Sequence, residues 1–121
     1  MGLFSAHEIN PAEIAEKYGP ILIAGESVLA AFRTVRDTAF LTTHRFVLVD
    51  VQGLTGSKVA IQSIPYRSIV RFSVETAGSF DLDADLNLWI SSAAAPITVK
   101  ISRQSDTIAI QKLLGEKVLA R

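Results

Sequence analysis

Three aspartates stand at alternate positions in the segment GSFDLDADLNLWI, and carboxylates so close together in sequence raise the question of a metal site. A calcium-binding loop of the helix-loop-helix type that began at Asp81 would need glycine at its sixth position and glutamate at its twelfth. Those positions hold Leu86 and Ser92. Apolar residues alternate with Asp81, Asp83 and Asp85, and this alternation favours a half-buried strand with one acidic face over a metal site.

Other residue types that support catalysis are scarce. The chain has no cysteine and only two histidines, His7 in the N-terminal segment and His44 in an expected tight turn, and it has no serine in a nucleophile elbow. The segment GLTGSK lacks the spacing and the following helix of a phosphate-binding loop, so we interpret Gly53 and Gly56 as hairpin residues with positive φ. The sequence therefore predicts no enzymatic activity, no metal and no cofactor.

The composition indicates a neutral globular protein of 121 residues. The 12 Lys and Arg residues balance the 12 Asp and Glu residues, which removes the long-range attraction that drives nonspecific binding to nucleic acid or to anionic membranes. The absence of cysteine fits a reducing compartment, the N-terminus lacks the features of a signal peptide, and no segment approaches the ~20 apolar residues of a membrane span. We expect a cytoplasmic protein whose partners are neither nucleic acid nor a membrane.

Two helices frame the predicted organisation. In INPAEIAEKYG, Asn10 can cap a helix that Pro11 begins and Gly19 ends, which places the first helix at about residues 10–18. The second helix, at about residues 105–120, carries one apolar stripe that consists of Ile110, Leu113, Leu114 and Val118.

Between the helices, short apolar alternations broken by turn residues predict a meander of antiparallel strands. The alternation is cleanest in VRFSVE and ITVKIS, where one face of each strand is expected to be buried. We expect seven strands, at Ser27–Val35, Thr38–Thr43, Arg45–Val51, Lys58–Ile64, Ser68–Glu75, Asp83–Ser91 and Ile97–Arg103. The predicted fold class is mainly β (α+β), with a strongly bent sheet or partly open barrel that a helix covers.

Four segments, THRFVLVD, GLTGSKV, IPYRSIVRFSVETAG and FDLDADLNLWI, follow one another in an order typical of one known family. On these segments, the chain from Leu41 to Ser92 resembles the bacterial pleckstrin-homology-like (PH-like) domain family. The resemblance implies a single PH-like domain over residues 1–121, a seven-stranded antiparallel barrel of two bent sheets at about residues 27–103 with a C-terminal α-helix and an extra N-terminal helix. It also implies a ring-shaped homo-oligomer, since members of the family tend to form such rings and have no assigned enzymatic activity.

The leading functional prediction is a non-catalytic domain that assembles with copies of itself and acts as a platform for another protein. Trp89 lies in phase with the aspartates, which places the only tryptophan on the outward face of its strand. We expect the N-terminal helix to cover this side chain, and the alternative is a neighbouring subunit.

The candidate interface also includes the charged residues near Trp89. Like charges along one strand repel one another unless a base on a neighbouring strand relieves them. If the strand at Ser68–Glu75 pairs with the acidic strand, Arg71 is expected to face the aspartates, with Arg67 or Arg103 as further candidates. The predicted interface residues are Asp81, Asp83, Asp85, Trp89 and Arg71.

The alternative prediction is a peripheral module that binds anionic lipid or phosphoinositides. The resemblance implies this function because eukaryotic PH domains hold the lipid head group with basic residues around the first hairpin. The basic residues of that region in this chain are Arg33, Arg36 and Arg45. The sequence departs from the eukaryotic pattern, since the first strand has no lysine and Asp37 lies inside the turn.

Overall fold

The computed structural model describes residues 8–33, 37–53, 57–76, 84–101 and 107–120. The strands in these parts are β1 (Glu8–Ile9), β2 (Val28–Arg33), β3 (Thr38–Thr42), β4 (Arg45–Gln52), β5 (Lys58–Pro65), β6 (Ile69–Glu75), β7 (Ala84–Ile90) and β8 (Ile97–Ile101). The helical elements are α1 (Pro11–Tyr18), α2 (Thr107–Val118) and the short 3-10 turns η1 (Gly19–Ile21) and η2 (Tyr66–Ser68). The seven predicted strands are confirmed as β2–β8, and the two-residue strand β1 is an addition.

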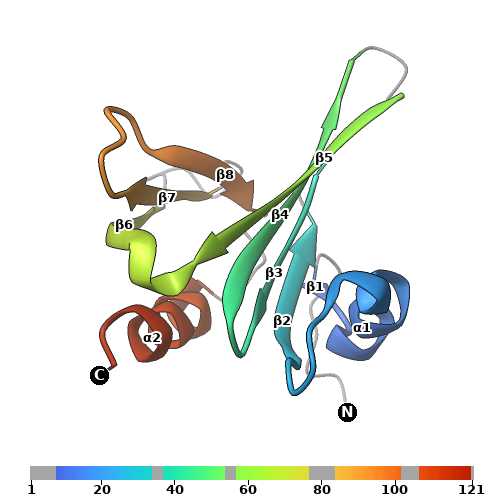
Figure 1. The fold of residues 1–121 in the computed structure, drawn as a ribbon. Coiled ribbons are helices and arrows are strands. Elements are labelled where there is room, and N and C mark those ends of the chain that lie inside the picture. The colour runs from blue at the N-terminus through green and yellow to red at the C-terminus, as the bar shows by residue number, and fades with distance from the viewer. Residues whose placement is uncertain (1–7, 34–36, 54–56, 77–83, 102–106, 121) are drawn as a thin grey trace.

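All described strand pairs are antiparallel and form two sheets. One sheet has the order β1-β2-β3-β4-β5, and the other has the order β6-β7-β8 (Figure 1). The 3-10 turn η2 separates β5 from β6, which belong to different sheets although they follow each other in the chain. The predicted PH-like arrangement of two bent antiparallel sheets with helices at both ends of the chain is therefore confirmed.

The main core lies between the two sheets and under α2. It draws on the inward residues of both sheets, among them Phe46 and Leu88, which are fully buried. The predicted apolar stripe of α2 meets this core, because Ile110 and Leu114 are buried and Leu113 and Val118 pack against it. The amphipathic pattern of the C-terminal segment thus leads to the expected contact.

A second, smaller core lies between α1 and the outer face of the five-stranded sheet (Figure 1). Ile14 and Tyr18 of α1 pack there against Phe40, Val47 and Val49, and the rings of Tyr18 and Phe40 lie 5.3 Å apart. β3 and β4 are apolar on both faces, so the outer face of their sheet needs a cover as well as the inner one. The helix that covers it is α1.

The hairpin of β4 and β5 runs beyond the neighbouring strand β3 (Figure 1). The last residue pair between β3 and β4 is Thr38 with Val49, whereas β4 and β5 pair as far as Gln52 with Lys58. The carboxylate of Asp37 accepts a hydrogen bond of 2.9 Å from the backbone N–H of Val51, a donor that β3 does not reach. The outer half of this hairpin is therefore built on two strands only.

Local sequence signals explain the ends of several elements. The Asn10 side chain accepts a hydrogen bond of 2.9 Å from the backbone N–H of Ala12, and Pro11 is the first residue of α1, as predicted. Gly53 has φ +83° directly after β4, which confirms its predicted conformation, while Gly56 lies outside the described residues. No described helix is long and apolar enough to cross a membrane.

We predict that Asn10→Ala destabilises the protein by about 1 kcal/mol, because the first turn of α1 loses its side-chain acceptor. Urea denaturation of both proteins would measure the difference. Asn10→Asp, which keeps an oxygen acceptor at the cap, is the matched control and should remain close to the native stability. Equal midpoints for Asn10→Ala and the native protein would show that the cap contributes nothing.

Candidate functional site

The outer face of the three-stranded sheet carries the described part of the predicted interface. Leu86 and Leu88 of β7 point into the main core, so Asp85 and Trp89 lie on the opposite, outward face. The predicted antiparallel pairing of β6 with β7 is confirmed. Asp81 and Asp83 lie outside the described residues.

Arg71, not α1, covers one face of the Trp89 ring. The two residues are direct partners across β6 and β7, and the Arg71 guanidinium carbon lies 4.3 Å from the ring centroid. A cation–π contact at a partly exposed site contributes about 0.5–1 kcal/mol. The expectation that the N-terminal helix covers Trp89 is wrong, because α1 is held on the other sheet by the second core.

The partner of Asp85 is also different from the predicted one. Lys100 of β8 lies opposite Asp85, and its Nζ is 3.0 Å from the carboxylate. Arg71 lies opposite Trp89 instead, because the register of β6 and β7 places Glu75 next to Asp85. Arg103, another predicted partner, lies outside the described residues. Both members of the Asp85–Lys100 pair are partly exposed, so their mutual stabilisation is small.

A buried amide joins the three strands on this outward face, and the sequence analysis did not identify it. Asn87 is only 7% exposed. Its Nδ2 donates to Glu75 Oε1 at 2.9 Å and to Ser73 Oγ at 3.2 Å, and its Oδ1 accepts from Thr98 Oγ1 at 2.8 Å. These bonds satisfy the amide and fix the register of β6, β7 and β8 relative to one another. Among the described residues, no three His, Asp or Glu side chains are grouped as metal ligands would be.

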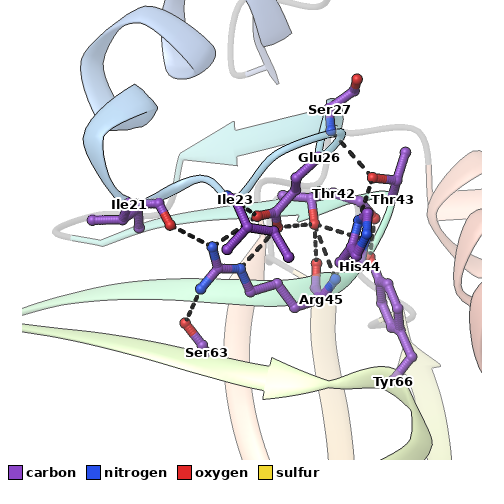
Figure 2. A network of polar contacts seen from close by, with 10 residues as sticks. All are labelled: Ile21, Ile23, Glu26, Ser27, Thr42, Thr43, His44, Arg45, Ser63 and Tyr66. Atoms are coloured by element: carbon purple, nitrogen blue, oxygen red, sulfur yellow. Dashed lines mark hydrogen bonds and ion pairs between the residues drawn. The ribbon is translucent and has the colours of Figure 1, made fainter.

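A second polar cluster surrounds Arg45 at the start of β4 (Figure 2). Arg45 Nε and Nη2 donate to the two carboxylate oxygens of Glu26, both at 2.8 Å. Arg45 also donates to the carbonyl oxygen of Ile21 at 2.6 Å and to Ser63 Oγ at 2.8 Å. The guanidinium therefore ties the connection between α1 and β2 to β4 and β5.

Hydroxyl groups complete the cluster beneath this ion pair. Thr42 Oγ1 donates to Glu26 Oε2 at 2.6 Å, and the phenol of Tyr66 donates to the carbonyl oxygen of Thr42 at 2.7 Å (Figure 2). The Glu26 side chain has no exposed surface, and that of Arg45 is 19% exposed. The hydrogen bond from Arg45 lowers the pKa of Glu26 to about 2, while burial raises the pKa of Tyr66. The same ion pair raises the pKa of Arg45.

This cluster corrects the prediction that three arginines form an anion site. Arg45 is not a solvated turn residue, because its donors are directed to Glu26, Ile21 and Ser63. Arg33 is exposed at the end of β2, and Arg36 lies outside the described residues. A buried partner carboxylate 19 residues away in sequence gave no local signal from which the role of Arg45 could have been predicted.

The most exposed apolar residues of the sheets lie on β5. Val59 is 53% exposed and Ile61 is 46% exposed. They pair with Val51 and Val49 of β4, so they continue the face that α1 covers over Val49, beyond the reach of that helix. Among the described strands, β5 pairs only with β4, and its other edge has no strand partner. An apolar strip beside an open sheet edge is suited to contact with another protein chain.

We predict that the ion pair makes stability depend on pH in the acidic range. Because the pKa of Glu26 falls from 4.5 to about 2 on folding, the native state is favoured above pH 4.5, and this advantage disappears as the pH falls through 2. The shift corresponds to about 3 kcal/mol. Denaturant unfolding of the native protein and of Glu26→Gln, from pH 7 to pH 2, would measure it.

The Glu26→Gln variant should lose less stability than the native protein over this pH range, because it lacks the titrating group. All other carboxyl groups are the same in both proteins, so their contributions cancel in the difference. If both proteins lose stability in parallel, the Glu26–Arg45 pair does not contribute in this way.

Comparisons with known proteins place this architecture in one family. The chain is 50% identical over 114 residues to the uncharacterized protein YjqA of Bacillus subtilis (strain 168), which covers 93% of this chain and 91% of that protein. The crystal structure of a protein with a pleckstrin-homology domain from Shewanella loihica PV-4 superposes with a TM-score of 0.84 at 41% identity, over 95% of this chain and 98% of that one.

A second solved structure agrees. The pleckstrin homology domain from Shewanella amazonensis SB2B has a TM-score of 0.80 and 42% identity, over 96% of this chain and 94% of that one. The family model of the bacterial PH domain matches residues 1–118. With the two antiparallel sheets and the terminal helix described above, the chain belongs to the bacterial PH domain family.

Proposed function

We propose that this chain is a non-catalytic protein-interaction domain that assembles with copies of itself into a closed ring. The observation that carries the proposal is the strip of Val59 and Ile61 on the open edge strand β5. Sheet edges pair readily with other strands unless charge, proline or a covering element protects them. Of the β5 residues from Lys58 to Ile64, only Lys58 is charged. This edge is therefore weakly protected.

The proposal extends to a further partner, another protein that binds the assembled ring. The outward face of the three-stranded sheet supports this part, because Trp89 and Arg71 lie there beside an ordered row of polar side chains. Aromatic residues and arginine are the types most enriched among the residues that dominate protein interfaces. The lipid-binding alternative is not favoured, since the donors of Arg45 are directed into the protein.

We predict that the native protein has a solution mass that is a stable multiple of 13.1 kDa over a dilution series. Ile61→Lys should raise the concentration needed for assembly at least about tenfold, because it places a charge in the apolar strip. Multi-angle light scattering would measure the mass of both proteins. Ile61 is 46% exposed, so the substitution should leave the stability of the subunit within about 0.5 kcal/mol of the native value.

Ile23→Lys is the matched control. Ile23 is also apolar and 58% exposed, but it lies outside the strands in the connection between η1 and β2. Its substitution should leave the mass unchanged. A native protein of 13.1 kDa at every concentration would remove the support for self-assembly.

A further inference from the structure

Two open sheet edges face away from the pairs already formed. Among the described strands, β5 has only β4 as a neighbour and β6 has only β7. Both edges carry exposed side chains, with Lys58 and Gln62 on β5 and Arg71 and Glu75 on β6. The helix α2 packs near β6, against the inner side of its sheet. The two edges therefore offer backbone groups of the same strand length to a partner strand.

The side chains of these two edges match in one antiparallel register. When Lys58 is placed opposite Glu75, Val59 falls opposite Val74 and Ile61 opposite Phe72, which puts apolar residues together on one face. On the other face, the remaining opposite pairs are Ala60 with Ser73 and Gln62 with Arg71. A shift of one residue would put apolar side chains opposite polar ones, and a shift of two residues would separate Lys58 from Glu75.

Within one chain these strands do not form this ladder. The described pairs of β5 are all with β4, and those of β6 are all with β7. The turn η2 directs the chain from one sheet to the other, and its first residue, Tyr66, is buried and hydrogen-bonded to the carbonyl oxygen of Thr42. The complementarity of the two strands is thus left unused inside the subunit.

We propose that β5 of one copy pairs antiparallel with β6 of the next copy, with Lys58 opposite Glu75. This inference rests on the proposed self-assembly and specifies its interface. The partner is a second copy of this chain because the matching charges and apolar residues are both present on one sequence. The pairing covers Val59 and Ile61, which are about half exposed in the subunit.

The contact joins two different surfaces, so it is head to tail. Each copy gives its β5 edge to one neighbour and its β6 edge to the other, and such a contact closes into a ring when the rotation between copies allows it. Glu75 accepts the Asn87 amide through Oε1, and a carboxylate has enough acceptor sites to bind Lys58 as well. The buried Asn87 then fixes the position of the acid that the next copy binds.

A charge exchange tests the register. Lys58→Glu and Glu75→Lys should each raise the dissociation constant of the assembly at least about tenfold, because each places like charges opposite one another. The double variant should restore the native mass in light scattering. Glu75→Gln keeps an acceptor for Asn87, so it controls for effects on the subunit, and it should weaken assembly less than Glu75→Lys.

Cysteine substitutions give a second readout, since the native chain has no cysteine. Ala60 and Ser73 are small and lie opposite each other in the proposed register. Under mild oxidation, a mixture of Ala60→Cys and Ser73→Cys should form a disulfide-linked dimer on a denaturing gel, whereas each variant alone should stay monomeric there.

The possible failures are distinguishable. An assembly whose mass does not respond to the charge exchange, with no disulfide in the mixture, would overturn this pairing and leave self-assembly intact. A dimer formed by Ser73→Cys alone, or rescue of Glu75→Lys by Arg71→Glu, would overturn it in favour of β6 pairing with its own copy. A monomeric native protein would overturn both the pairing and the proposed function.

Discussion

The burial of β3 and β4 on both faces is the constraint from which the rest of the architecture follows. Phe46 and Leu48 of β4 point into the main core, and Val47 and Val49 point to the opposite side. A hairpin that is apolar on both sides needs two covers, because either face left in water would forfeit the free energy of burial. The second sheet with α2 provides one cover, and α1 provides the other. The position of α1 is thus a consequence of the sheet and leaves Trp89 to other contacts.

The Glu26–Arg45 pair fixes the connection that brings α1 to this sheet. Removing two charges from water is costly, and an ion pair compensates for that cost only where its geometry is good and its remaining polar atoms are satisfied. Both conditions hold, since two Arg45 donors meet both oxygens of Glu26, and Thr42 and the backbone N–H of Ile23 supply further bonds to the carboxylate. The pair links the loop before β2 to the start of β4, so it acts on tertiary structure and not on a ligand.

Two sheets that do not close completely leave edges, and those edges connect the fold to the proposed function. The turn η2 prevents β5 and β6 from pairing within the chain and leaves one edge open on each sheet. On β6 the outward side is ordered by Asn87, Glu75 and Ser73, whereas β5 presents Val59 and Ile61 with little charge. An edge with an apolar strip and an edge with an ordered acid are different surfaces, and this difference favours a head-to-tail assembly over a two-fold dimer.

The sequence by itself determined the features that depend on neighbouring residues. The cap at Asn10, the stripe of α2 and the strands β2–β8 were all predictable, because each arises from local hydrogen bonding or from a period of apolar residues. The continuous apolar runs of β3 and β4 also carried a signal for two-sided burial that the alternation argument passed over.

Tertiary structure alone decided the partners of Arg45, Asp85 and Trp89 and the buried role of Asn87. Each of these depends on the register between strands, or on a loop that returns to the sheet from many residues away. A local pattern specifies which face a residue occupies, but the atom that it meets across that face is set by long-range packing.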